Sequence, residues 1–319
     1  MTLVRSFALL VLVLSASACN DRRADVGRDT QPAPTDAPPA LATAHQAYLA
    51  GDYIEMGERL KEVIADPHTG ELARDNAFSL LESAFDAKHG QLPARASLPQ
   101  GVKVITLGVL NGGNPWGSHR IIFVDMRVTE ARSAHIKEVR LTKLPNETIL
   151  SRSEQRGTFR ITHLRDGIDD VKLEVRQPDV LPDRGAFAVQ VVFDDGAGLD
   201  TFVLANKLVS SAQPEVTSPA IGQVLRDTHP ELAWHPFRSP ELASWEQRAM
   251  SLAVTHGPSN ATAWELYKWE PGELGSVRVG AALEPDSYYF SMTCSEERVF
   301  GAVRVMRATE AGGPFSIVP

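Results

Sequence analysis

The chain has 319 residues, of which 43% are hydrophobic and 23% are charged, and its formal net charge is -8. This length predicts two or three folded units, and the apolar content excludes a chain that is mostly disordered. The two cysteines, Cys19 and Cys294, are too few for a scaffold held together by several disulfides. The negative charge and the scattered basic residues exclude a typical nucleic-acid-binding protein.

The first 18 residues show the three parts of a secretory signal peptide. Arg5 supplies the positive charge, residues 7–14 form an unbroken apolar run, and residues 15–18 are all small. A helix that spans a bilayer needs about 20 apolar residues, and this run is much shorter. We therefore expect a removable export signal at residues 1–18 rather than a transmembrane anchor.

The end of this signal, Ala16-Ser17-Ala18-Cys19, resembles the lipobox of bacterial lipoproteins. The resemblance implies that Cys19 is acylated and becomes the first residue of an exported protein, which the lipid attaches to a membrane. Asn20 stands where an aspartate would favour inner-membrane retention, so the outer membrane is favoured over the inner membrane. The alternative is ordinary cleavage after Ala18, which would leave a free N-terminal cysteine.

Residues 19–40 predict a tether that follows the lipidated cysteine. This stretch contains four prolines and almost no large apolar residue. Proline-rich chains favour extended conformations of about 3 Å per residue. We expect the tether to hold the folded part of the protein away from the membrane.

Residues 41–90 predict a small helical unit. Between residues 44 and 67 the apolar residues recur at spacings of three and four, which is the period of an amphipathic helix. Gly51-Asp52 interrupts this pattern and divides it into two helices, the second of which Asp52 can cap. A further stretch with helical period follows at residues 71–88.

The helical unit resembles a tetratricopeptide repeat through Tyr48, Gly51-Asp52-Tyr53 and the closing Pro67. The resemblance implies a peptide-binding groove in which Tyr48 and Tyr53 are candidate contacts. Such arrays need about three repeats to be stable alone, and this chain contains one and a half. The leading interpretation is therefore a helical hairpin packed on the next domain, with the peptide-binding groove as the alternative.

Residues 101–209 predict a first β-sandwich, because the apolar period changes to two. Residues 194–200 form a hairpin turn signal between the last two strands. Eight short strands at regular spacing are typical of a sandwich. The expected strands are residues 102–110, 122–128, 136–144, 148–151, 158–163, 171–175, 186–193 and 201–205.

Residues 217–310 predict a second β-sandwich after a polar linker at residues 210–218. The expected strands are residues 220–225, 231–235, 248–255, 262–269, 277–281, 287–293 and 300–308. The predicted fold class is therefore mainly β, with two β-sandwich domains preceded by a small α-helical hairpin unit.

Two segments of the second unit resemble fibronectin type III modules, which are immunoglobulin-like sandwiches. Pro230–Trp234 is similar to their second strand, which implies that Trp234 lies in the core. Leu283–Phe290 is similar to the approach to their sixth strand, which implies a corner tyrosine. Position within the segment favours Tyr289, whereas the alternation of apolar residues favours Tyr288, and both remain open.

Sequence motifs for catalysis and metal binding are absent. The nine histidines include no pair with zinc-site spacing, and there is no GxSxG elbow. The glycine-rich residues 108–117 lack the lysine of a phosphate-binding loop, and the acidic clusters at 166–170 and 194–200 lack EF-hand spacing. We therefore expect no catalytic residue, no metal and no cofactor, and we expect Cys294 to be a small buried residue.

Three aromatic residues are candidate binding contacts. Trp116 lies in the glycine-rich loop, where it either contacts a sugar or partner protein or folds back on its own sheet. Tyr267 and Trp269 share one face of a predicted strand. That face is either a platform for carbohydrate or a seam packed against the first sandwich, and we favour the seam.

These observations together predict a lipoprotein of the bacterial cell envelope that acts as a non-enzymatic binding or scaffolding module. Its expected partners are the membrane, through the lipid on Cys19, and an envelope protein or a carbohydrate, but no nucleic acid. The alternative function is an envelope enzyme, or an enzyme accessory, that acts on polysaccharide. A third interpretation assigns the helical unit a partner peptide, which Tyr48 and Tyr53 would contact.

Overall fold

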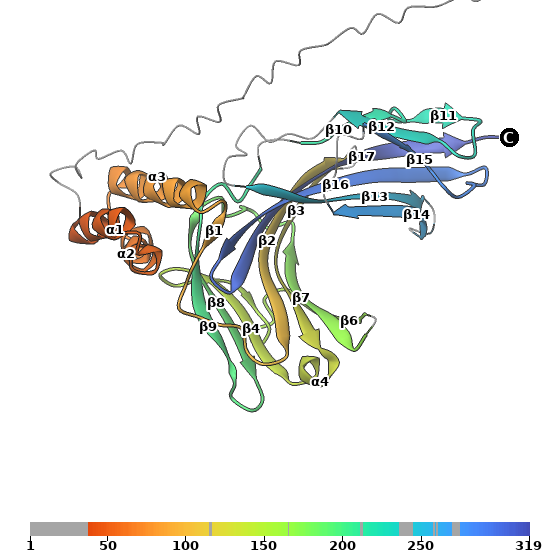
Figure 1. Ribbon diagram of the computed structural model, residues 1–319. Coiled ribbons are helices and arrows are strands. Elements are labelled where there is room, and N and C mark those ends of the chain that lie inside the picture. The colour runs from red at the N-terminus through yellow and green to blue at the C-terminus, as the bar shows by residue number, and fades with distance from the viewer. Residues whose placement is uncertain are drawn as a thin grey trace, which may run out of the picture.

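The computed structural model describes residues 38–114, 117–164, 166–210, 213–235, 245–257, 259, 261–269 and 275–319. This part of the chain is mainly β, with a group of helices at its N-terminal end, which confirms the predicted fold class (Figure 1). The helices are α1 (Pro39–Ala50), α2 (Tyr53–Ala65), α3 (Glu71–Ala87) and the short α4 (Glu130–Ser133). None of the described helices is long and apolar enough to cross a membrane.

Helices α1 and α2 form the hairpin that the apolar period predicts. Gly51 ends α1 in a left-handed conformation (φ 76°), which glycine adopts without steric cost. Asp52 then begins α2, because its side chain accepts a hydrogen bond of 3.0 Å from the backbone N–H of Glu55. The Gly51-Asp52 pair therefore both ends one helix and starts the next.

The largest sheet has ten strands, and eight of them follow the order β14-β13-β16-β17-β2-β3-β7-β6. The strands β1 and β11 pair in parallel with β16 and β17. The bounds are β1 (Gln91–Leu92), β2 (Val102–Asn114), β3 (Gly117–Thr129), β6 (Thr158–His163), β7 (Ile168–Arg176), β11 (Gln223–Leu225), β13 (Glu246–His256), β14 (Thr262–Trp269), β16 (Ser287–Phe300) and β17 (Val303–Ile317).

Two smaller sheets face this large sheet. The four-stranded sheet has the order β5-β4-β8-β9, and the three-stranded sheet has the order β10-β12-β15. Their bounds are β4 (Ile136–Lys143), β5 (Glu147–Ser151), β8 (Gly185–Phe193), β9 (Gly198–Ala205), β10 (Glu215–Ser218), β12 (Glu231–His235) and β15 (Ser276–Arg278).

The large sheet contains strands from both of the segments that the sequence predicts as separate sandwiches. β17, near the C-terminus, pairs in parallel with β2 from Val303 opposite Ile105 to Glu310 opposite Gly112. The hairpin of β16 and β17 is long enough to pair with β13 at one end and to cross to β2 at the other (Figure 1). The boundary between residues 101–209 and 217–310 is therefore bridged by one continuous sheet.

Each half of the molecule still has its own hydrophobic core. The first core contains apolar side chains of β2, β3, β7 and the four-stranded sheet, together with those of α1, α2 and α3. The second core lies between the three-stranded sheet and β13, β16 and β17, and it contains Trp234. β10 belongs to this second layer although its residues were predicted to be linker, because Val216 pairs opposite Trp234 and packs on the core.

The structure distinguishes the two candidate corner tyrosines. Tyr288 is buried in the second core, and its hydroxyl donates a hydrogen bond of 2.9 Å to the backbone carbonyl of Glu284. Tyr289 lies on the opposite face of β16 and is half-buried. The alternation of apolar residues therefore predicted the buried tyrosine correctly, and the hydrogen bond to a residue a few positions upstream is that of a tyrosine corner.

Candidate binding groove

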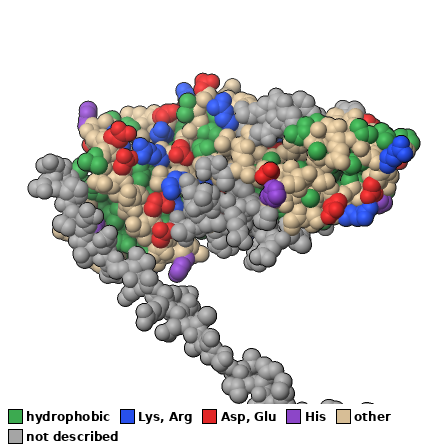
Figure 2. Space-filling model, turned by 90° about the horizontal axis from the view of Figure 1, so that it is seen from above, with side chains coloured by type: hydrophobic (Ala, Val, Ile, Leu, Met, Phe, Trp, Pro, Cys, Tyr) green, Lys and Arg blue, Asp and Glu red, His purple; other side chains and the backbone are tan. Residues whose placement is uncertain are grey.

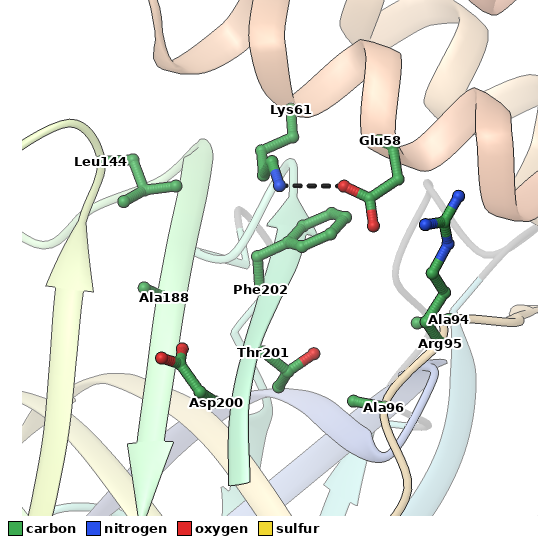
Figure 3. A pocket seen from close by; sticks show the side chains of 10 residues that line it. All are labelled: Glu58, Lys61, Ala94, Arg95, Ala96, Leu144, Ala188, Asp200, Thr201 and Phe202. Carbon is green, nitrogen blue, oxygen red and sulfur yellow. Dashed lines mark hydrogen bonds and ion pairs between the residues drawn. The ribbon is translucent and has the colours of Figure 1, made fainter.

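A groove of about 440 Å³ lies between helix α2, strand β9 and the segment 94–96 that leads from β1 toward β2 (Figure 3). Its volume falls within the roughly 300–1,000 Å³ that is usual for ligand pockets. The lining residues are Glu58 and Lys61 of α2, Ala94, Arg95 and Ala96, Leu144 after β4, Ala188 of β8, and Asp200, Thr201 and Phe202 of β9.

Helix α2 closes one end of the groove with an ion pair that rests on an aromatic ring. The ammonium of Lys61 lies 2.9 Å from a carboxylate oxygen of Glu58, one turn away on the same helix. The same ammonium lies 4.3 Å from the centroid of the Phe202 ring, which is a favourable cation–π distance. Phe202 packs in turn on Phe300, with ring centroids 5.4 Å apart, so the ring is fixed in place.

The segment opposite β9 is extended and has small side chains next to the groove. Ala94, Ala96 and Leu98 are half-buried against the first core, whereas the residues between them are exposed. Arg95 is 68% exposed, and its guanidinium makes one loose contact of 3.7 Å with Glu55. This wall therefore presents an exposed cation over an otherwise small and apolar surface.

Charge is distributed unevenly along the groove. Arg95 and the ion pair of Lys61 with Glu58 lie at the end next to α2, whereas the exposed carboxylate of Asp200 lies farther along β9 (Figure 3). Because Glu58 pairs with Lys61, the groove offers the exposed cation of Arg95 at one end and the acid of Asp200 at the other, with the half-buried Phe202 between them. Such an arrangement suits a ligand with an apolar centre and charged groups of opposite sign at its ends.

Tyr48 and Tyr53, the candidate contacts of the helical unit, lie together on the helical hairpin but do not line this groove. Their rings meet edge to face, with centroids 6.1 Å apart. The ammonium of Lys88 lies 4.7 Å from the Tyr53 ring centroid, and both tyrosines are half-buried against the first core. Their contacts show a packing role for both tyrosines.

The other candidate residues can be placed only in part. Cys19 and Trp116 lie outside the described residues. The backbones of Tyr267 and Trp269 belong to β14 and pair opposite Ser251 and Ala249, but their side chains lie outside the described part of the structure.

A cluster of charged side chains lies elsewhere, on neighbouring strands β3 and β7 of the large sheet. Asp125 pairs opposite Lys172, and Asp170 lies two residues before Lys172 on β7. Burial raises the pKa of Asp125 to about 7, the charge of Asp170 adds to the shift, and Lys172 and Arg127 oppose it.

The same cluster contains the buried carboxylate of Glu174, which is surrounded by three cations. Arg176, Arg160 and Lys172 lie 2.8, 2.9 and 3.0 Å from its oxygens. Burial alone would raise the pKa of Glu174, but the hydrogen bonds from Arg176 and Lys172 outweigh it, and the pKa is lowered. The ionised carboxylate therefore lies among three cations, which is typical of a structural ion network.

The remaining reactive groups show no catalytic arrangement among the described residues. No group of three or more His, Cys, Asp or Glu side chains in that part of the chain could hold a metal ion. Cys294 is buried in the second core, and burial raises the pKa of its thiol to about 12. Acidic and basic side chains are mixed over the face shown in Figure 2 rather than gathered in a patch of one sign.

No feature of the sequence alone identifies the groove residues. Arg95 lies in a stretch predicted to be linker, and Asp200 lies in a predicted turn. Glu58 and Lys61 resemble any exposed pair on an amphipathic helix. These residues come together only because α2, the segment 94–96 and β9 pack against one core, and local pattern does not encode that relationship.

Comparisons with known proteins provide no family for the chain. No family model and no curated protein matches it. Among solved structures, it is similar to fibronectin(III)-like modules of Clostridium thermocellum CbhA, with 9% identity, a TM-score of 0.22, and coverage of 66% of this chain and 92% of the other.

Two animal proteins are similar to the same extent. The N-terminal Ig1-2 module of the Drosophila receptor protein tyrosine phosphatase DLAR has 10% identity and a TM-score of 0.30, over 70% of this chain and all of the other. The FN1-FN3 domains of chicken CNTN1 have 12% identity and a TM-score of 0.24, over 69% of each chain. Similarity at this level supports no inference about function.

Proposed function

We propose that this chain is a lipid-anchored protein of the bacterial cell envelope that binds a partner through the groove between α2 and β9. In this proposal the protein holds its partner and performs no reaction on it. The observation that carries the proposal is the groove itself. Three segments that are distant in sequence meet there around the fixed ring of Phe202. The exposed charges of Arg95 and Asp200, which are opposite in sign, lie toward its two ends.

The proposed location rests on the N-terminal sequence. The signal-like residues 1–18, Cys19 and the proline-rich stretch after it have the order expected of an exported lipoprotein. Acylation of Cys19 would attach the protein to the outer membrane, and the tether would place the groove at a distance from the lipid surface.

The alternative, an enzyme or enzyme accessory that acts on polysaccharide, gains no support from the described residues. Asp125 pairs opposite Lys172 on the large sheet, and neither Asp125 nor Asp170 lines the groove. Glu174, the other buried acid of that region, is neutralised by three cations. We therefore propose binding rather than hydrolysis.

Photocrosslinking in intact cells tests whether the groove binds a partner. A photoreactive amino acid replaces Arg95 in one variant and Asp200 in another, since both side chains line the groove and are exposed. The matched control carries the same amino acid at Glu147, an exposed residue of β5 at the opposite edge of the four-stranded sheet.

We expect irradiation to yield a discrete adduct from both groove positions and none from Glu147. Mass spectrometry of the adduct then identifies the partner. If neither groove position yields an adduct, or if Glu147 yields the same adduct, the groove is not a binding site in the cell.

A further inference from the structure

Strand β9 is an edge strand of the four-stranded sheet. It pairs with β8 on one side and is the last strand in the order β5-β4-β8-β9. Among the described residues, no backbone hydrogen bond joins the outer edge of β9 to another segment. An edge of this kind presents unpaired N–H and C=O groups to any extended chain that approaches it.

The register of the hairpin determines which backbone groups face outward. The N–H of Phe193 donates a hydrogen bond of 2.9 Å to the carbonyl of Ala197, and the same register continues with Leu199 opposite Val191 and Thr201 opposite Val189. Hydrogen-bonded pairs alternate along an antiparallel ladder. Leu199 and Thr201 therefore bond to β8, and the intervening residues point their backbone groups away from it.

The other side of β8 agrees with this assignment. Leu144 donates a hydrogen bond of 2.9 Å to the carbonyl of Ala186, so the even-numbered residues of β8 bond to the β4 side. The odd-numbered residues of β8 are consequently left for β9. The backbone groups of Asp200 and Phe202 thus point outward, and both residues line the groove.

The edge of β9 is accessible from the groove at residues 200–202 and is covered at residues 203–205. Val203, Leu204 and Ala205 at the α2 end of β9 are buried, whereas Asp200 is exposed and Phe202 is only half-buried. Residues 198–205 contain no lysine or proline, which are common protections of an exposed edge. Across the groove, Ala94 and Ala96 leave room beside the exposed part of the strand.

We propose that the groove binds an extended peptide segment of a partner protein, which adds to β9 as a further strand. Antiparallel pairing continues the pattern of this sheet and is the more stable arrangement. The inference rests on the proposed function and names the class of its partner. A peptide fits better than a compact ligand because the outward groups of Asp200 and Phe202 repeat every second residue, as a β-strand requires.

The charges of the groove define the peptide further. β9 runs from Asp200 toward α2, so an antiparallel peptide begins near the exposed Arg95 and ends near Asp200 (Figure 3). It therefore carries an acidic residue first, an apolar residue beside Phe202, and a basic residue last. Opposite charges across a strand pair stabilise it, and like charges destabilise it.

Selection from a library of displayed random heptapeptides on the full-length chain provides the probe. We expect enriched peptides with an acidic residue preceding a basic one, and a synthetic peptide of that consensus is then used for binding and hydrogen exchange. Addition of the peptide should slow amide exchange at Asp200 and Phe202. It should leave Thr201 unchanged, because that amide already bonds to β8.

Two substitutions at one position separate backbone pairing from charge. Asp200→Ala removes the carboxylate and keeps the N–H, whereas Asp200→Pro also removes the outward N–H, which an edge strand tolerates. We expect the proline variant to bind the peptide about tenfold more weakly than the alanine variant, which corresponds to about 1.4 kcal/mol. Circular dichroism of both variants shows whether the fold is intact.

Charge reversal at an exposed side chain gives a second test that does not disturb the strand. Arg95→Glu should weaken the consensus peptide and shift selection toward a basic first residue, and Glu147→Lys on β5 should change neither. Strand addition would be overturned by any one of three results. These are that no peptide is enriched, that the two Asp200 variants bind the peptide equally, or that the peptide does not slow amide exchange at Asp200 and Phe202. Adducts from Arg95 and Asp200 in cells would then still support the proposed function.

Discussion

The guanidinium of Arg298 donates two hydrogen bonds to the carboxylate of Glu82, although 216 residues separate them in the chain. Glu82 lies on α3 and Arg298 on β16, so this bidentate pair joins the helical unit to the large sheet. The guanidinium also lies 4.3 Å from the Trp245 ring centroid and 4.6 Å from that of Phe85. The helical unit is therefore an integral part of the first core and one wall of the groove.

Removal of Glu82 should strongly destabilise the protein. Glu82→Ala would leave the buried cation of Arg298 without its anion, which typically costs about 3–5 kcal/mol. Denaturant unfolding should show this loss of unfolding free energy. The control Glu62→Ala removes an exposed partner of Arg59 and should cost at most about 1 kcal/mol. Equal effects of the two substitutions would contradict the anchoring role of Glu82.

The tyrosine corner should make a smaller but measurable contribution. Tyr288→Phe keeps the buried ring and removes the hydrogen bond to the Glu284 carbonyl. We expect the free energy of unfolding to fall by about 1 kcal/mol, the usual net value of one such bond. Thermal or denaturant unfolding of the variant measures this change. An unaltered stability would mean that the hydroxyl gains as much from water as from Glu284.

The acid pair on the large sheet should make stability depend on pH. The pKa of Asp125 is raised to about 7 in the folded chain, above the value of about 4 for an unfolded aspartate. The folded state therefore binds more protons than the unfolded state between these pH values, and this contribution to stability is lost as the pH rises from about 4 to 7. The full stabilising contribution of Asp125 is present only below about pH 4.

Asp125→Asn tests this expectation because the amide keeps the shape and never ionises. At pH 8 the variant should be more stable than the wild type by about 2–4 kcal/mol, and at pH 4 the difference should disappear. Unfolding curves at both pH values supply the comparison. A variant that is equally stable, or less stable, at pH 8 would show that folding does not raise the pKa of Asp125.

Cys294 should be unreactive in the folded protein. Its side chain is 1% exposed, and burial raises its thiol pKa to about 12, so almost no thiolate forms at neutral pH. A chromogenic disulfide reagent should label it only after denaturant is added. Fast labelling of a Cys19→Ala variant under native conditions would contradict this burial, because Cys294 is then the sole cysteine.

Short-range patterns in the sequence predict most elements of the fold. The period of two marks the strands, and the Gly51-Asp52 interruption marks the helical hairpin, because each pattern reports which side of an element is buried. The same alternation places Tyr288 rather than Tyr289 in the core. The four residues of β10 escape notice, because Val216 is their only large apolar side chain.

The arrangement of the elements is harder to predict. Alternation shows which face of β17 is buried, but it contains no information that β2 lies beside it in parallel. The groove depends on the same kind of long-range relationship. Arg95, Lys61 and Phe202 acquire a common role only after three distant segments pack together. Neither a motif nor a spacing in the sequence reports that event.

The most direct test of a lipid-anchored envelope protein is the N-terminal mass of the chain recovered from fractionated cells, compared with that of Cys19→Ala. We expect the wild type to lie in the membrane fraction and to begin at Cys19 with the added mass of acyl chains. We expect Cys19→Ala to lose this mass and to appear in the soluble envelope fraction. A wild-type protein that is unmodified and soluble would contradict the anchor and the location proposed for the groove.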